Sequence, residues 1–301
     1  MSETFPSATN LSTRSTLISA DELARHAADP RWVILDCRHD LADPAAGMTA
    51  YSGGRIPGAH FASLDRDLSD QTPASDGIFR GRHPLPTRTA LLATLRAWGI
   101  GDDSQVVAYD AQGGMFAARL WWMLRWVGHG AVAVLDGGLP AWLAAGLPTV
   151  AGPDTPGPAG TLSDRAWLVT TVSAADIVAD LVADLGHARR TIIDARAPER
   201  FRGENETLDP VGGHIPGARN RFFKDNLQAD GRFQPAAQLR AEFAALISDP
   251  SQAVMQCGSG VTACHNLLAM EIAGMPGAAL YPGSWSEWCA DPARPVATGA
   301  N

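Results

Sequence analysis

One cysteine of the chain stands where a reactive thiol could be positioned. Cys257 follows an apolar run that ends at Gln256, and residues 258–262 after it read Gly-Ser-Gly-Val-Thr. A glycine-rich turn between a strand and a helix can point backbone N–H groups inward, toward negative charge. The helix expected to begin near Val261 adds the positive end of its dipole. The turn therefore favours a thiolate, the nucleophilic form of sulfur; the alternative is that Cys257 is a small buried apolar side chain.

The same loop supplies the other groups that a negatively charged sulfur would need. Ser259 places a hydroxyl two residues after the thiol. Backbone N–H groups that follow a nucleophile can stabilise charge that develops beside it. The residues expected to bind the substrate in this way are Gly258, Gly260, Val261 and Thr262.

The elements that must position this loop occur twice along the chain. Both copies contain an apolar strand that ends in aspartate and is followed by arginine, a Gly-Arg/His-Ile-Pro-Gly-Ala segment, and a glycine turn that leads into a tryptophan. The paired segments are 32–38 and 191–196, 54–59 and 213–218, and 135–142 and 280–288. Their common order and nearly constant spacing predict a duplicated domain.

Each half alternates short β-branched runs with longer helical stretches. The predicted strands include 105–109, 131–135 and 253–256, and the predicted helices include 87–99, 115–127, 235–247 and 261–273. Strands that are buried on both faces and joined by crossover helices predict an α/β fold, with one parallel sheet flanked by helices on both faces in each half. The Pro/Gly-rich segment 150–160 divides the chain into domains at 17–150 and 161–296.

Composition indicates which partners and which cellular compartment to expect. The chain has 24 basic and 32 acidic residues, a formal charge of -8, and no cluster of Lys or Arg, so nucleic-acid binding is not expected. Its four cysteines are too few for a disulfide framework, which indicates a reducing compartment. The Ser/Thr-rich segment 1–16 has no apolar core, so we expect it to be neither a secretory signal nor a membrane anchor. We expect a cytoplasmic monomer without a cofactor. A metal site is not expected either, because Cys264 and His265 fall on the helix after Cys257 and lack the spacing of zinc ligands.

The loop 257–264, Cys-Gly-Ser-Gly-Val-Thr-Ala-Cys, resembles the active loop of the mercaptopyruvate sulfurtransferases of the rhodanese superfamily. The repeated segments fit the same family, and the resemblance runs from about Leu17 to Pro295. It implies an enzyme that moves a sulfane sulfur from 3-mercaptopyruvate to a thiol or cyanide through a persulfide on Cys257, with release of pyruvate. A thiol protein such as a thioredoxin is the implied acceptor.

The first half has no cysteine in the matching loop. Asp110 follows the strand 105–109 and occupies the place of the nucleophile. Because a carboxylate cannot carry a persulfide, we predict that the first domain is catalytically silent, as the resemblance also implies.

The first half is also longer than the second, around residues 64–86. The resemblance implies that a loop here reaches the partner domain, where a histidine and an acid join Ser259. The matching residues are His83 and Asp67, with Asp65 and Asp70 as near rivals. Such a set could donate a hydrogen bond or a proton to the enolate that forms when the C–S bond of the donor breaks. The alternative is an ordinary loop histidine and a solvated carboxylate.

The carboxylate of such a donor needs a cation, ideally a guanidinium. Arg200 matches the carboxylate-binding arginine of the family, although a single arginine is often only a surface charge. A second family arginine, about nine positions later, is absent, and Asp209 stands there instead. Arg202 or Arg119 could compensate.

Three other functions remain open on sequence alone. Rhodaneses that prefer thiosulfate, a dianion, resemble one another in having Arg and Lys after the nucleophile, whereas this chain has Gly258 and Ser259. A cysteine phosphatase needs an arginine to close its loop, and residues 258–263 contain none. A non-catalytic sulfur-relay module is the third alternative.

Overall fold

The two halves of the chain each form one parallel sheet. The computed structural model describes residues 13–73, 76–154, 157–182 and 190–300. The strands are β1 (Leu17–Ile18), β2 (Trp32–Asp36), β3 (His60–Phe61), β4 (Gln105–Tyr109) and β5 (Val132–Leu135) in the first half, and β6 (Thr191–Asp194), β7 (Arg219–Asn220), β8 (Ala253–Gln256) and β9 (Ala279–Leu280) in the second. Their orders are β1-β5-β4-β2-β3 and β7-β6-β8-β9, and every pairing between them is parallel. The predicted α/β fold with two parallel sheets is confirmed.

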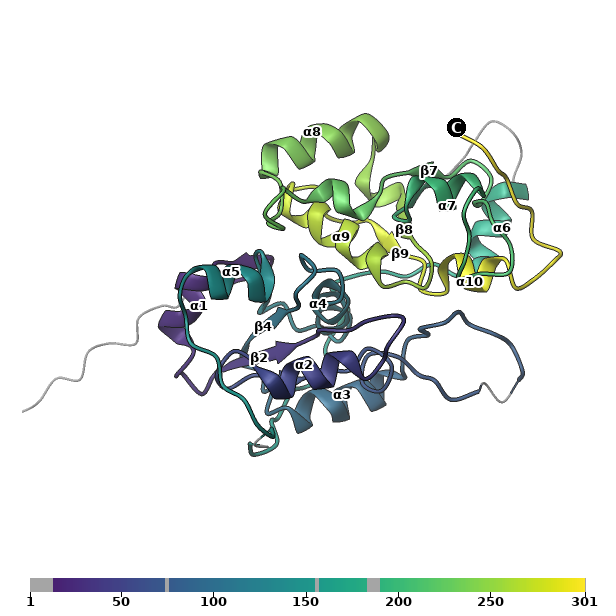
Figure 1. Cartoon of the computed structure of the whole chain (residues 1–301). Helices are drawn as coiled ribbons and strands as arrows, with labels where there is room; N and C mark the ends of the chain where they lie inside the picture. The colour runs from purple at the N-terminus through teal and green to yellow at the C-terminus, as the bar shows by residue number, and fades with distance from the viewer. Residues whose placement is uncertain (1–12, 74–75, 155–156, 183–189, 301) are drawn as a thin grey trace, which may run out of the picture.

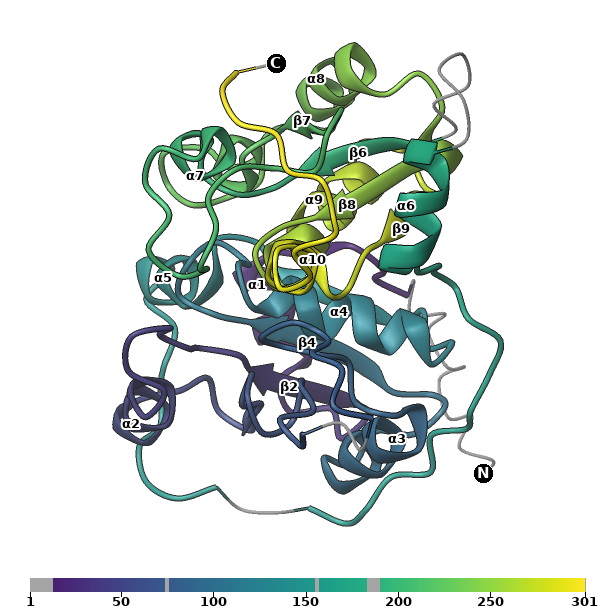
Figure 2. The same cartoon turned by 90° about the vertical axis from the view of Figure 1, so that its right-hand side faces the viewer.

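Helices cover both sheets (Figures 1 and 2). They are α1 (Ala20–His26), α2 (Ala46–Gly53), α3 (Arg88–Ala97), α4 (Ala117–Trp126) and α5 (Gly138–Ala144), then α6 (Ala174–Val182), α7 (Pro198–Arg202), α8 (Ala236–Leu246), α9 (Thr262–Ile272) and α10 (Ser284–Trp288), with short 3-10 turns at Phe223–Asn226 and Pro250–Gln252. The four helices predicted from periodicity are α3, α4, α8 and α9, and their ends lie within two residues of the predicted ends. Among the described residues, no helix is both long and apolar enough to cross a bilayer.

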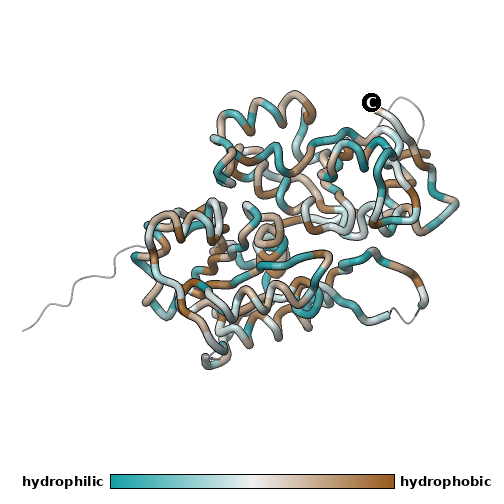
Figure 3. Tube along the Cα trace, viewed as in Figure 1, coloured by the Kyte–Doolittle hydropathy of each residue, from teal (hydrophilic) through white to brown (hydrophobic). Residues whose placement is uncertain are grey.

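The central strand β4 explains why the sheet of the first half is covered on both sides. Val106 and Ala108 belong to one buried cluster, whereas Val107 and Tyr109 belong to another on the opposite face. This alternation follows from the two-residue period of a strand. Figure 3 shows hydrophobic and hydrophilic residues interspersed along α8, whose buried residues Leu239 and Phe243 are four positions apart and so lie on one side of the helix.

The seam between the halves is part of the largest apolar core. Helices α4 and α9 pack against each other there (Figures 1 and 2), and the buried cluster at the seam contains residues of both, such as Trp122 and Leu268. Arg125 of α4 forms an ion pair with Glu271 of α9 at 3.0 Å. Both helices begin at the loop that follows the central strand of their sheet, so the seam brings the Cys257 loop close to the first half.

The chain remains with the first half for some residues after the Pro/Gly-rich segment. The N–H of Gly160 donates to the carbonyl of Arg96, and Leu162, which is fully buried, donates to that of Ile100. The first backbone hydrogen bond from this segment to the second sheet comes at Thr170, whose carbonyl accepts from the N–H of Leu280. We therefore propose that the domain boundary lies nearer residue 169 than the predicted 161.

Candidate active site

Cys257 lies at the carboxyl end of β8, directly before α9, and its side chain is buried. Its N–H donates to Oγ of Ser284 at 3.1 Å, and its carbonyl accepts from Trp285 at 2.9 Å. The loop turns at Gly260, which has a φ of +78°. A Cβ there would lie 2.3 Å from the carbonyl oxygen of Pro282, so only glycine fits. The start of α10 thus holds the loop in place from one side.

Four consecutive backbone donors follow the thiol. Within the part of the chain that the structure describes, the N–H groups of Gly258, Ser259, Gly260 and Val261 donate to no protein acceptor. They adjoin the first turn of α9, whose end carries partial positive charge. Unpaired donors beside a helix N-terminus are suited to a negatively charged sulfur. Thr262, the fourth residue predicted to bind substrate through its backbone, is the first residue of α9.

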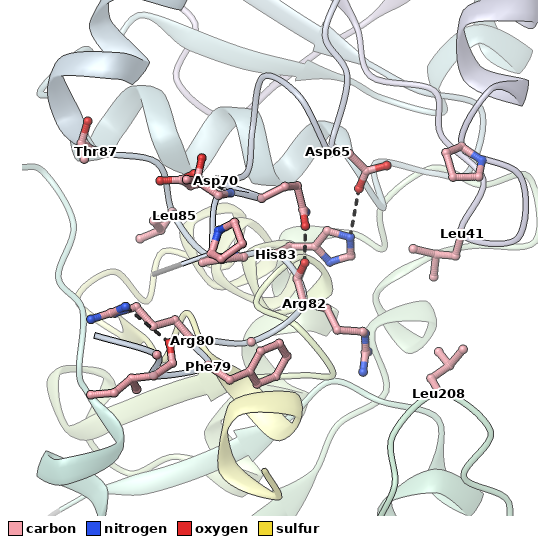
Figure 4. Close-up of a pocket in the computed structure, with 18 of the residues that line it drawn as sticks. Leu41, Asp65, Asp70, Phe79, Arg80, Arg82, His83, Leu85, Thr87 and Leu208 are labelled. Atoms are coloured by element: carbon pink, nitrogen blue, oxygen red, sulfur yellow. Dashed lines mark hydrogen bonds and ion pairs between the residues drawn. The ribbon is translucent and has the colours of Figure 1, made fainter. Parts of the chain in front are cut away.

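His83 of the first half reaches Ser259 of the second. Its Nδ1 lies 2.7 Å from the hydroxyl oxygen of Ser259, and its Nε2 lies 3.4 Å from Oδ1 of Asp65. Figure 4 shows Asp65 and the His83 ring facing each other across this gap. The Nε2–H tautomer, inferred from these partners, places a hydrogen toward Asp65 and leaves Nδ1 to accept the Ser259 proton. The structure thus brings two of the predicted residues together.

Asp67 stays away from this pair. Its carboxylate accepts from the N–H of Ser63 at 2.9 Å and forms an ion pair with Arg66 at 2.8 Å. The interpretation that Asp67 joins His83 is therefore corrected, and the acid beside the ring is Asp65. The reason is local: the Asp67 carboxylate binds Ser63 and Arg66 within its own turn. Sequence spacing along an irregular loop does not reveal which of two nearby carboxylates makes such internal bonds.

The imidazole of His83 is neutral at neutral pH. Burial, together with the nearby positive charges of Arg119 and Arg82, lowers the pKa of His83 to about 3. A neutral ring can accept a proton from the Ser259 hydroxyl at Nδ1, which a protonated ring could not. Ser259 is thereby oriented as a hydrogen-bond donor that can be deprotonated and reprotonated.

Arg119 supports the site from beneath. It is fully buried, and it donates to the carbonyl of Gly260 at 3.1 Å, to that of His83 at 3.0 Å and to that of Leu68 at 3.3 Å. Burial lowers the pKa of Arg119. Because its donors are directed to these carbonyls, it ties the loops of both halves together and is not the missing carboxylate-binding arginine.

The segment 81–83 is fixed against the second half. Gly81 has a φ of +95°, and a Cβ there would lie 2.6 Å from the carbonyl oxygen of Gly283. The N–H of Arg82 donates to Oγ of Ser286 at 3.1 Å. The close approach at Gly81 and the bond from Arg82 set the position of His83 at the next residue.

Arg200, which the resemblance matches to the carboxylate-binding arginine, lies beside the Cys257 loop. A Cβ built on Gly258 would lie 3.7 Å from both terminal nitrogens of Arg200. The guanidinium forms ion pairs with Glu206 at 2.8 Å and with Asp209 at 3.2 Å. Arg202 instead pairs with the exposed Glu204, which leaves it without a role at this loop.

Sequence reasoning missed Arg82 as a member of this group. Its Nη2 would lie 2.8 Å from a Cβ on Gly258, and its Nη1 forms an ion pair with Asp209. The only signal in the sequence is that Arg82 directly precedes His83. Nothing in the linear pattern places this residue of the first half over the second half's loop.

A cavity of about 1080 Å³ opens beside the His83–Asp65 pair (Figure 4). Apolar side chains border it, including Leu41, Phe79 and Leu208, each about half exposed. Cys257 does not line this cavity, so the space is an approach to the site rather than the position of the reacting sulfur.

Cys264 and His265, the potential metal ligands next to the Cys257 loop, contact other protein groups. Cys264 contacts the carbonyl of Gly260 at 3.3 Å, and burial raises its pKa to about 12. His265 lies 3.0 Å from the carbonyl of Gly113 through Nε2 and 3.1 Å from Nδ2 of Asn226 through Nδ1. Over the described residues, no three potential ligands gather at one point.

The chain is similar to known proteins over nearly its whole length. The model of the rhodanese-like domain matches residues 19–145 and again 175–291. A probable 3-mercaptopyruvate sulfurtransferase from Pseudomonas aeruginosa is 50% identical over 288 residues, which is 94% of this chain and 98% of that protein. A putative thiosulfate sulfurtransferase, SseB, from Mycobacterium tuberculosis is 42% identical over 290 residues, 94% of this chain and 97% of that protein. The crystal structure of SseA from Escherichia coli, titled a 3-mercaptopyruvate sulfotransferase, has 31% identity and a TM-score of 0.75, covering 90% of this chain and 98% of its own.

Proposed function

The chain belongs to the family of rhodanese-like proteins and is a sulfurtransferase, and we propose that Cys257 takes the sulfane sulfur of 3-mercaptopyruvate and passes it to a thiol. The observation that carries this proposal is the loop at Cys257: a buried thiol is followed by four N–H groups that have no acceptor among the described residues, and then by a helix N-terminus. These donors would stabilise the negative outer sulfur of a persulfide.

The first step forms an S–S bond and breaks a C–S bond. The Cys257 thiolate attacks the sulfur of the donor, and the electron pair of the C–S bond leaves as the enolate of pyruvate. The proton of the donor's thiol passes by way of the Ser259 hydroxyl to the carbon of this enolate, which balances the step. His83 accepts a hydrogen bond from that hydroxyl at 2.7 Å and positions it for this relay. Asp65 faces the other ring nitrogen and would stabilise the ring whenever Nδ1 accepts the Ser259 proton. Pyruvate leaves, and Cys257 carries the persulfide.

The second step returns the enzyme to its starting state. An acceptor thiolate attacks the outer sulfur, takes it as a new persulfide, and releases the Cys257 thiolate in a ping-pong scheme. We propose a dithiol protein such as a thioredoxin as the acceptor, and cyanide serves the same role in an assay. The cavity beside His83 offers room for an approaching thiol.

The uncharged loop favours 3-mercaptopyruvate over thiosulfate. Gly258 and Ser259 carry no charge, so the loop itself adds little attraction for a dianion. Thiosulfate remains the second candidate, because the name of one relative with 42% identity refers to it.

Steady-state kinetics with both donors test the assignment. With one acceptor at a fixed concentration, we expect kcat/KM for 3-mercaptopyruvate to exceed that for thiosulfate by at least about tenfold. A preference for thiosulfate would overturn the donor assignment, and no turnover with either donor would favour a sulfur-relay module.

We further propose that the enzyme works as a monomer in the cytoplasm. Both halves of one chain meet at the site, through His83 and Ser259, so a second copy is not needed to complete it. All four cysteines are free, which fits a reducing compartment. Light scattering coupled to size exclusion would show a mass near 31.7 kDa for a monomer.

A further inference from the structure

Two guanidinium groups from different halves of the molecule border the same space beside Gly258. The nearest atoms to a Cβ built at that residue are Nη2 of Arg82, at 2.8 Å, and both terminal nitrogens of Arg200, at 3.7 Å. Gly258 directly follows Cys257, so this space adjoins the reacting sulfur. Figure 4 shows the Arg82 side chain extending away from the His83 ring and toward Leu208.

Asp209 holds both cations from the buried side. Its carboxylate forms ion pairs with Nη1 of Arg82 and with Nη2 of Arg200, and its side chain is only 3% exposed. Glu206 occupies the remaining inward face of Arg200. The acidic residues therefore fix the orientation of the two guanidinium groups, whose side chains stay 28% and 19% exposed.

The nitrogens that these acids leave unused lie near the space beside Gly258. Among the described residues, Nη2 of Arg82 and Nη1 of Arg200 donate to no protein acceptor. Each is also one of the atoms closest to the Gly258 position. Two unpaired N–H donors on adjacent guanidinium groups match the two oxygens of a carboxylate.

The other arginines near the site have different partners. Arg196 is buried and pairs with Asp194 at 2.6 Å. Arg119 and Arg202 are committed to loop carbonyls and to Glu204 respectively. Arg82 and Arg200 are therefore the pair that can meet a ligand at Gly258.

We propose that Arg82 of the first half and Arg200 of the second together bind the donor's carboxylate, with Asp209 as the residue that positions both. The inference rests on the proposed function, because the ligand is the 2-oxo acid that Cys257 attacks. Arg82 thus contributes a charge to the loop of the other half, next to the histidine that contributes to its proton chemistry. Asp209 occupies the position at which the family has its second arginine. Its carboxylate instead holds Arg82, which reaches this site from the first half.

The kinetic test replaces Arg82 with an uncharged side chain of similar length. For R82M we expect KM for 3-mercaptopyruvate to rise at least about tenfold while kcat changes less than about threefold, because a carboxylate remote from the breaking bond is bound equally in ground and transition states. R82K should recover part of the loss, since it restores charge without the planar fork. The matched control is R80M, because Arg80 lies on the same segment and pairs with Asp76 away from the loop. An unchanged KM in R82M, or an equal rise in R80M, would overturn the proposal.

A second readout does not need sulfur transfer at all. The rates at which iodoacetate and iodoacetamide alkylate Cys257 differ mainly through the carboxylate of the first reagent. We expect R82M to lower the iodoacetate-to-iodoacetamide rate ratio at least about fivefold and to leave the iodoacetamide rate unchanged. If the ratio falls in this way but the wild type does not turn over 3-mercaptopyruvate, the carboxylate site stands and the proposed function fails. A ratio that stays the same in R82M, or an equal loss with both reagents, would overturn the carboxylate site.

Discussion

Each half has a loop between a central strand of its sheet and the helix that follows, but the backbone N–H groups of the two loops differ in whether they have an acceptor. The Asp110 loop, residues 110–116, follows β4 and leads into α4, and the Cys257 loop, residues 257–261, follows β8 and leads into α9. The Asp110 carboxylate fills the first loop by accepting hydrogen bonds of 2.8 to 3.0 Å from the backbone N–H groups of Gln112, Gly114, Phe116 and Ala117. In the Cys257 loop, the described donors at 258–261 have no such partner.

The difference shows that the same arrangement of backbone N–H donors before a helix can contribute either to folding stability or to anion binding. Each donor satisfied inside the protein contributes to folding, whereas a buried donor without a partner costs on the order of 1–3 kcal/mol. The first half satisfies these four donors with its own carboxylate and so does not offer them to a ligand. The second half leaves them for an anion, which is the arrangement expected where binding, rather than rigidity, is selected.

The first half nevertheless reaches into the site of the second. Its segment 81–83 contributes Arg82 near Gly258 and His83 at Ser259. We therefore view the first half as a domain that has Asp110 in place of a nucleophile in its own loop and supplies groups that act around Cys257 of the second half. The following changes test this division of labour, from the largest expected effect to the smallest.

The largest effect should come from giving the second loop the residue of the first. We expect C257D and C257S each to lower turnover with either donor by at least about 10⁴-fold, because neither side chain can carry a sulfane sulfur. The free energy of unfolding of C257D should also exceed that of C257S by about 1 kcal/mol, if the new carboxylate accepts hydrogen bonds from the N–H groups of residues 258–261 as Asp110 does in its own loop. Pyruvate release and urea unfolding measure the two quantities. Residual turnover in C257S would contradict the assignment of the nucleophile.

The next effect concerns the pair that spans the two halves. We expect S259A and H83N each to lower kcat/KM for 3-mercaptopyruvate by about 10²- to 10³-fold, because the enolate loses its hydrogen-bond and proton source. The loss with thiosulfate should be much smaller, since sulfite leaves without needing a proton on carbon. Equal losses with both donors would mean that the pair supports the loop rather than the chemistry.

A third change removes the carboxylate that fills the first loop. D110A should lower the free energy of unfolding by about 2–4 kcal/mol, because four backbone N–H groups, three of them buried, lose their acceptor. D110N, which keeps one acceptor oxygen, should lose about half as much. In both variants, kcat/KM at a temperature where the protein is folded should stay within about twofold of the wild type. A stable D110A protein with impaired turnover would show that the first loop has a role in catalysis.

A smaller effect distinguishes the two carboxylates near His83. We expect D65N to lower kcat/KM for 3-mercaptopyruvate by about fivefold, a modest loss because Asp65 lies 3.4 Å from the ring and is partly exposed. D67N should change it by less than about twofold, because its partners are Ser63 and Arg66. The same assay with both variants measures the difference. The reverse order of effects would reinstate Asp67.

The smallest effect concerns His265, which joins α9 to the Asp110 loop through the carbonyl of Gly113. Burial lowers the pKa of His265 to about 4, below its ordinary value of 6.5. The unfolded chain therefore binds more protons between these values, so this stabilisation is complete above pH 6.5 and is lost as pH falls toward 4. H265N should take up about one proton fewer than the wild type on unfolding in this window. Urea unfolding at several pH values measures the difference, and identical pH dependence would contradict it.

Local pattern was enough to predict most of the fold. The helices α3, α4, α8 and α9 were predictable because apolar periodicity marks them, and β4 and β8 because both are short runs buried on both faces. The duplication predicted two similar sheets, and the glycine-rich turn predicted where Cys257 would stand. These features depend on residues that are close together in the sequence.

The parts that could not be predicted depend on contacts between distant segments. The approach of Arg82 to Gly258 requires the first half to cross the seam, and no periodic signal encodes it. The choice between Asp65 and Asp67 depends on which carboxylate an irregular turn uses internally. The partners of Arg119 likewise come from two loops far apart in the sequence, one in each half, so only their arrangement in space shows that Arg119 is structural.

The central claim is that one loop of the two carries sulfur, and intact mass after exposure to 3-mercaptopyruvate without an acceptor tests it most directly. We predict a single adduct of about 32 Da, one sulfur atom on the cysteine oxidation and persulfidation ladder. Peptide mapping should place it on Cys257, and C257S should show none. An unmodified wild-type protein, or an adduct on Cys37, Cys264 or Cys289, would contradict the account.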